Sequence, residues 1–144
     1  MKTALIATIV ASSVAAFAAR ADEIRKIDFT SPIVVDGKPV IDDILCPVSV
    51  DQNDKPIKDA KGETSRPCET PYTVGAVAFY SLRTFAQGQD WQSAIRRYDL
   101  GVVVRHAEDY PATRDQLDTI EKAMGPNWTP SILAAARAIM DPGK

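Results

Sequence analysis

Four sets of start and stop signals divide the second half of this chain into short helices. Each expected helix follows a residue whose side-chain oxygen can accept hydrogen bonds from the first free N–H groups, namely Thr73, Asp90, Thr113 and Thr129. Apolar residues then recur at intervals of three and four, which is the spacing of one face of an α-helix. We therefore expect a mainly α fold, with a C-terminal bundle of about four short helices in residues 70–144.

The first two helices are bounded by glycine and proline. We expect the first to end at Gly88, with a core face formed by Val74, Val77, Ala78, Leu82 and Phe85. We expect the second to end before Tyr110-Pro111, with a core face formed by Ala94, Ile95, Tyr98, Val102 and, as a further candidate, Leu100. Gly101 either weakens this second helix or allows another helix to cross it closely.

The third and fourth helices carry signals at both ends. Thr113 and Gln116 can form a capping box, and Gly125 is placed to cap the end of the third helix before Pro126. Pro130 occupies the first turn of the fourth helix. The expected core faces are Leu117, Ile120 and Met124 in the third, and Ile132, Leu133, Ala136, Ile139 and Met140 in the fourth.

Residues 22–69 favour extended structure followed by a polar loop. The β-branched run Ile33-Val34-Val35 precedes Asp36-Gly37, a strong short signal for a β-hairpin, and Val40-Ile41 follows. Pro32 and Pro39 lack the N–H donor, so the strands should be short and lie at an edge. We treat residues 22–144 as one domain built from this extended segment and the helical region, residues 70–144.

The first 21 residues have the layout of a secretory signal peptide. Lys2 is followed by an uncharged run over residues 4–19, and Ala19-Arg20-Ala21 is a small-x-small cleavage site. The apolar run is shorter than the about 20 residues that a membrane-spanning helix needs. We therefore favour cleavage after Ala21 over an uncleaved anchor, and cleavage after Ala18 is the alternative site.

Removal of this leader determines where we expect the mature chain to be found and what net charge it carries. Residues 22–144 would be periplasmic or secreted in a bacterium, with no stable membrane span. Loss of Lys2 and Arg20 leaves 15 basic and 19 acidic side chains, a net charge of −4. This acidic balance argues against a protein that binds the phosphate backbone of nucleic acids.

Cys46 and Cys68 are the only cysteines in the chain. In an exported protein an even number of cysteines is interpreted first as a disulfide. The bridge would close a polar loop of about 22 residues and contribute roughly 3 kcal/mol through the entropy of loop closure. Zinc sites usually space their cysteines by two to four residues, and this pair does not. We therefore predict a structural disulfide.

Few residues are suited to catalysis or to metal binding. His106 is the only histidine, and its place at the end of the second helix favours a surface or capping role. Asp51-x-Asn53 begins like a calcium loop, but Lys55 and Pro56 stand where a ligand and a glycine are needed. We therefore predict no cofactor and no metal site. These residues also favour a non-enzymatic protein over an enzyme.

Trp91, Arg96, Arg97 and Trp128 are the candidate partner-binding residues. Arginine and the large aromatic residues supply much of the binding energy of protein interfaces, and both tryptophans stand at helix starts beside loops. The alternative is that each tryptophan fills the core at a helix corner and that the arginines form solvated pairs along their helix. The partner we expect is an envelope or secreted protein, and the oligomeric state is left open.

The C-terminal half contains four sequence patterns: Thr-Val-Gly-x-Val at 73–77, Ile-Arg-Arg-Tyr-x-Leu at 95–100, Thr-x-x-Gln-Leu-x-x-Ile-x-x-x-Met-Gly at 113–125 and Thr-Pro-Ser-Ile-Leu-x-x-Ala-x-x-Ile-Met-Asp-Pro at 129–142. With these patterns the chain resembles a set of small, uncharacterised proteins encoded in bacteriophages and in prophage-rich bacterial genomes. Ile27-Asp28-Phe29 and Asp36-Gly37-Lys38-Pro39 are also similar, so the resemblance spans residues 27–142. The resemblance implies an accessory protein of a mobile element or its host, and it carries over no activity and no catalytic residue. The leader and the two cysteines depart from the pattern.

The combined signals favour an exported, non-enzymatic binding or accessory protein. Two alternatives stay open. A small carboxylate-dependent hydrolase would use Asp42, Asp43, Glu108 and Asp109, of which two would have to lie within about 10 Å across a cleft. A cytoplasmic phage accessory protein would instead keep its first 21 residues.

Overall fold

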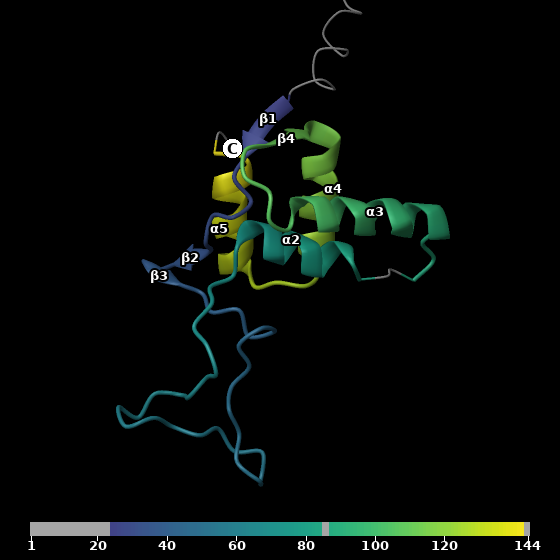
Figure 1. Ribbon diagram of the computed structural model, residues 1–144. Coiled ribbons are helices and arrows are strands. Elements are labelled where there is room, and N and C mark those ends of the chain that lie inside the picture. The colour runs from purple at the N-terminus through teal and green to yellow at the C-terminus, as the bar shows by residue number, and fades with distance from the viewer. Residues whose placement is uncertain (1–23, 85–86, 143–144) are drawn as a thin grey trace, which may run out of the picture.

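The computed structural model describes residues 24–84 and 87–142, in which four helices and four short strands form a mixed fold (Figure 1). The helices are α2 (Val74–Leu82), α3 (Trp91–Val104), α4 (Arg114–Met124) and α5 (Pro130–Met140). The strands are β1 (Ile24–Ile27), β2 (Val34–Val35), β3 (Lys38–Pro39) and β4 (Tyr110–Thr113). With 38% helix and 17% strand, the predicted mainly α fold is confirmed only in part. The predicted leader, Phe85 and Gly143 lie outside the described residues.

α2 lies at the centre of the core. All nine of its residues are buried, so this helix is apolar on every side rather than on the one predicted face. Thr73 caps it, because its hydroxyl accepts a hydrogen bond from the N–H of Ala76 at 3.1 Å. The helix ends at Leu82 and not at Gly88, because the chain leaves the core at the exposed residues Arg83 and Thr84.

α3 packs on α2 through a face that differs from the predicted one. Its buried residues are Gly101 and Val104. A Cβ atom at Gly101 would lie 3.2 Å from the Cβ atom of Leu82, so the glycine allows the two helices to cross closely. Ile95, Tyr98 and Val102 were expected in the core, but they are 44%, 50% and 49% exposed. The close crossing at the glycine therefore decides which side of α3 is covered.

The last two helices largely confirm the sequence analysis. The capping box is complete, since the Thr113 hydroxyl accepts from the Gln116 N–H and the Gln116 side chain accepts from the Thr113 N–H. Leu117, Ile120, Met124, Ala136 and Met140 are buried. Gly125 is the C-cap of α4, but its φ of −46° is right-handed, not the left-handed conformation that glycine usually supplies there.

Two short antiparallel sheets tie residues 24–41 to the helices. β1 pairs with β4 from Ile24 opposite Thr113 to Ile27 opposite Tyr110, where the sequence predicted only a break. β2 and β3 form the predicted hairpin, with positive φ at Asp36 and Gly37, and β2 lies against α5. Phe29 and Ile33, which precede the hairpin, are fully buried in the core shared with α2. No helix within the described ranges has the length and apolar character needed to cross a membrane.

Candidate functional site

Residues 44–69 leave the body of the molecule as an arm (Figure 1). At its far end the Asp51 carboxylate accepts hydrogen bonds from the N–H groups of Asn53 and Lys55. The Asp59 carboxylate accepts hydrogen bonds from the N–H groups of Lys61 and Glu63 in the same way. Three backbone hydrogen bonds then join the segments of the arm in a closed cycle. These run from Ile57 N–H to Ser49 C=O, from Ser65 N–H to Ile57 C=O and from Ser49 N–H to Ser65 C=O. The polar loop is therefore an ordered projection.

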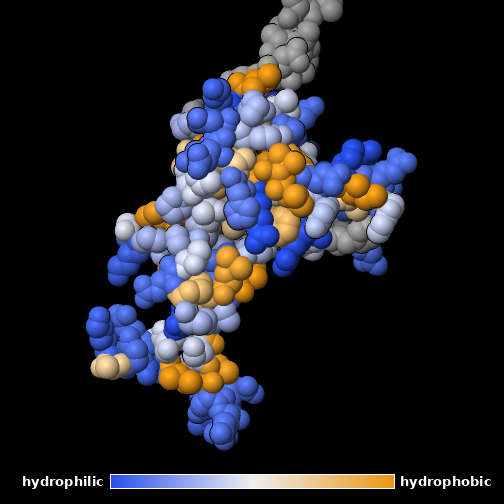
Figure 2. Space-filling model, viewed as in Figure 1, coloured by the Kyte–Doolittle hydropathy of each residue, from blue (hydrophilic) through white to orange (hydrophobic). Residues whose placement is uncertain are grey.

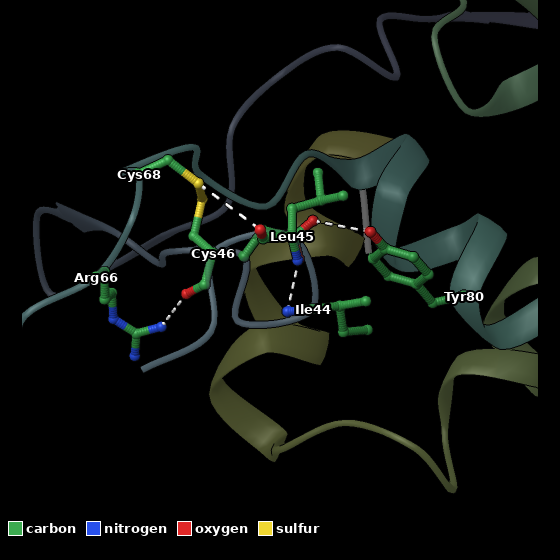
Figure 3. The surroundings of a disulfide bond; sticks show 7 residues. Ile44, Leu45, Cys46, Arg66, Cys68 and Tyr80 are labelled. Atoms are coloured by element: carbon green, nitrogen blue, oxygen red, sulfur yellow. Dashed lines mark hydrogen bonds between the residues drawn. A yellow bond between two sulfur atoms is a disulfide. The ribbon is translucent and has the colours of Figure 1, made fainter. Parts of the chain in front are cut away.

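The predicted disulfide closes the root of the arm. Cys46 and Cys68 are bonded, with their Cα atoms 5.2 Å apart (Figure 3). The Arg66 guanidinium donates to the Cys46 carbonyl oxygen at 2.6 Å and so crosses the same junction. A covalent bond and a charge-assisted hydrogen bond thus fix the direction in which the arm leaves the body.

A cleft of about 770 Å³ lies where the arm meets α2 and the start of α5, and we call it the root cleft. Its apolar lining includes Val40, Ile41, Ile44 and Ile132. Its aromatic and charged lining consists of Asp43, Arg66, Tyr72, Tyr80, Arg83 and Trp128. The root cleft therefore combines an apolar floor with two arginines and one carboxylate.

Three aromatic rings form one wall of the root cleft. The centroid of Tyr72 lies 5.0 Å from that of Trp128 and 6.2 Å from that of Tyr80, and both pairs meet edge to face. This is the geometry that aromatic quadrupoles favour. The Trp128 indole N–H donates to the hydroxyl of buried Ser81 at 2.7 Å, which sets the orientation of the ring. The three rings are thus held by contacts with one another and with α2.

Two adjacent carboxylates hold the tyrosines of this wall. Asp42 is 1% exposed, and its side chain accepts from the N–H groups of Ile44 and Leu45 and from the hydroxyl of Tyr80 (Figure 3). The hydroxyl of Tyr72 donates to Asp43. Burial, followed by the nearby carboxylates, raises the pKa of both tyrosine hydroxyls, and each hydroxyl donates to one of these carboxylates. The carboxylates therefore serve to position the aromatic wall.

Arg83 places a positive charge at the mouth of the root cleft. Its guanidinium carbon lies 4.9 Å from the ring centroid of Tyr80 and 5.7 Å from that of Phe79. Within the described part of the chain, no ion pair joins Arg83 to a carboxylate. A stacked guanidinium without a paired carboxylate keeps its N–H donors available to an acidic or carbonyl group of a ligand.

The structure separates the four predicted partner-binding residues. Trp128 lies in the root cleft, whereas Trp91, Arg96 and Arg97 belong to α3. Arg96 donates to the Ser93 hydroxyl at 3.0 Å and Arg97 to the side-chain oxygen of Gln89 at 2.8 Å. Trp91 is 72% exposed, so it does not fill the core.

The four carboxylates of the hydrolase hypothesis are also divided. Asp43 lines the root cleft, whereas Asp42 is buried behind it and accepts three hydrogen bonds. Glu108 and Asp109 are exposed between α3 and β4 and are not among the residues that line the cleft. His106 is exposed in the same turn. Among residues 24–84 and 87–142, no group of three or more His, Cys, Asp or Glu side chains is arranged to hold a metal ion.

Sequence reasoning missed the importance of Tyr72, Tyr80, Arg66 and Arg83. One signal was available, because Tyr80 stands in a stretch that is otherwise almost wholly apolar, and a buried tyrosine hydroxyl needs a hydrogen-bond partner. The arginines gave no such signal, since their position depends on where the arm leaves the body. Comparisons with protein-family models, with curated proteins and with solved structures found no match for this chain.

Proposed function

We propose that this protein is an exported, non-enzymatic binding protein that holds a partner protein in the root cleft. The observation that carries this proposal is the exposed Arg83 guanidinium, stacked on Tyr80 in the cleft that Trp128 also lines. Tryptophan, tyrosine and arginine are the residues that most often dominate binding energy when they cluster in a pocket. The apolar floor and the free donors of Arg83 suit a peptide segment that combines an apolar side chain with a carboxylate.

Two observations support export. The disulfide at the root of the arm is a bond that persists in oxidising compartments and is rare in the cytosol. Residues 1–21 carry the charge, the apolar run and the A-x-A site of a secretory leader. The resemblance to small phage-encoded proteins is compatible with an accessory role in the bacterial envelope, and this relation stays a prediction.

A site-specific photo-crosslinker tests whether the root cleft binds a partner. Thr129 is exposed, lines the cleft and makes no side-chain capping hydrogen bond, so a crosslinking residue should be tolerated there. Ala138 is exposed on the same helix outside the cleft and is the matched control position.

We expect envelope extract to give a defined crosslinked product from position 129 and not from position 138. Arg83→Ala should reduce that product at least tenfold, because the variant removes the free guanidinium and leaves the core intact. Products that are the same from both positions, or that are insensitive to Arg83→Ala, would contradict the proposal.

A further inference from the structure

α3 carries an apolar stripe that the fold leaves uncovered. Trp91, Ile95, Tyr98 and Val102 are 72%, 44%, 50% and 49% exposed, and they follow one another at intervals of four, three and four residues. At these intervals the four side chains lie on one side of an α-helix. Apolar residues, in orange, are visible on the surface over α3 in Figure 2. A contiguous exposed stripe of this kind marks an interaction surface more often than a solvated face.

The order of the stripe is symmetric, so the stripe can pair with a second copy of itself. The intervals four, three and four are the same in both directions along the helix. When two copies of α3 lie antiparallel, Trp91 therefore meets Val102 of the second copy, and Ile95 meets Tyr98. Each large side chain thus faces a smaller or medium-sized one, as interdigitating helices require. We propose that two copies of this protein associate through the α3 stripes in an antiparallel, two-fold symmetric pair.

The charges at the two ends of α3 favour the same arrangement. Asp90 caps the N-terminus of the helix, and Arg105 follows its C-terminus. In an antiparallel pair the end of α3 that carries Asp90 lies beside the end of the second copy that carries Arg105, and this occurs twice by symmetry. The Arg105 guanidinium lies 4.5 Å from the ring centroid of Phe79 in its own chain, so it is held near this end of the helix. The helix dipoles also oppose each other in this arrangement, whereas a parallel pair would align them and bring like charges together.

The exposed area suits a weak, reversible dimer. If the four side chains of the stripe were fully covered, about 500 Å² would be buried per chain, or about 1,000 Å² in a pair of chains. This value is at the low end for a specific interface. Tyr98 lies at the centre of the stripe and Trp91 at its end, and both belong to the aromatic types enriched in interfaces, which supports a specific contact.

Sedimentation analysis of the purified, disulfide-bonded protein over about 1 to 200 µM tests the pairing. We expect a reversible dimer in the wild type. Tyr98→Asp should raise the dissociation constant at least 100-fold, because it places a charge at the centre of the interface. Gln92→Asp is the matched control: it introduces the same side chain on an exposed position of α3 outside the stripe, and it should leave the dimer in place.

Two further measurements check that the variants are folded and that the helices pair in the expected register. The melting temperatures of the two variants show whether the fold has survived. To check the register, chains carrying Ile95→Cys are mixed with chains carrying Tyr98→Cys and treated with a short bismaleimide. The antiparallel pairing predicts that mixed dimers form in preference to dimers of either variant alone. A monomer throughout the concentration range, a dimer that is unaffected by Tyr98→Asp, or crosslinks only between like chains would each overturn the proposal.

Discussion

Asp42 is the residue whose removal should damage the candidate site most directly. Its buried carboxylate is the acceptor for the N–H groups of Ile44 and Leu45 and for the hydroxyl of Tyr80. A buried donor that loses its acceptor costs roughly 1–3 kcal/mol. We expect Asp42→Ala to lower the free energy of unfolding by about 3 kcal/mol in urea titrations.

Asp42→Asn is the matched variant, because its amide oxygen still accepts hydrogen bonds from the two backbone N–H groups. It should therefore cost clearly less than Asp42→Ala. If both variants unfold at the wild-type midpoint, Asp42 does not organise the root of the arm.

Asp141 should make the stability of the protein fall at acid pH. This residue is 4% exposed, and its carboxylate accepts from Arg114 of α4 at 2.7 Å and from Arg25 of β1. Arg114, followed by Arg25, holds the pKa of Asp141 below its ordinary value of 3.8. The folded state therefore binds this proton more weakly than the unfolded state does. The resulting stabilisation is present above about pH 4 and is lost as the pH falls through the lowered pKa.

The corresponding experiment compares Asp141→Asn with the wild type by urea unfolding at a series of pH values. The wild type should be the more stable protein at pH 7, and the difference should shrink below about pH 4. Asp99→Asn, at an exposed position of α3, serves as the control. A difference between wild type and Asp141→Asn that does not change with pH would exclude this role for Asp141.

α4 and α5 both begin after a threonine, but the two threonines differ in whether they cap their helix. Comparing them tests how much a side-chain cap stabilises a single helix. Thr113 completes a capping box at α4, whereas Thr129 makes no side-chain capping hydrogen bond at α5. We expect Thr113→Ala to cost about 1 kcal/mol of stability and Thr129→Ala to cost a few tenths at most. Thermal unfolding measures both. Equal effects would show that the capping box is not what holds the start of α4.

The first turn of α2 packs against the end of α3 with no room for a side chain. A Cβ atom at Gly75 would lie 2.5 Å from the Arg105 carbonyl oxygen and 2.6 Å from that of Val104. Gly75→Ala should therefore destabilise the protein by about 1–3 kcal/mol, although alanine is the better helix former. Gly125→Ala is the control, since its nearest atoms are 3.8 Å away and its φ is right-handed. A neutral Gly75→Ala would refute this packing.

The elements differ in how far the sequence could predict them. Helix starts were predictable, because a cap such as Thr113 acts within three residues. The buried face of α3 was not, because an apolar stripe has the same spacing whether it faces the core or a partner. Pairing of β1 with β4 joins residues that are far apart in the sequence, and no local pattern signals it. The same holds for the root cleft, where Tyr80, Arg83 and Trp128 meet only after the chain has folded.

At the scale of the whole molecule, the disulfide bears on both the proposed export and the proposed binding site. The polar arm contributes little to the core, so the covalent bond between Cys46 and Cys68 fixes the root from which it projects. Ile44 and Arg66, which lie beside the bond, also line the root cleft. Without the bond the two sides of the cleft would separate more easily, and the proposed binding surface would lose its shape.

Mass spectrometry of the protein recovered from the periplasm of a bacterial host tests the central claim most directly. An exported, oxidised protein should have the mass of residues 22–144 minus two hydrogen atoms, and it should gain those two hydrogens when it is reduced. Recovery of the full-length chain from the cytosol, with Cys46 and Cys68 both reactive toward a thiol reagent, would contradict the account.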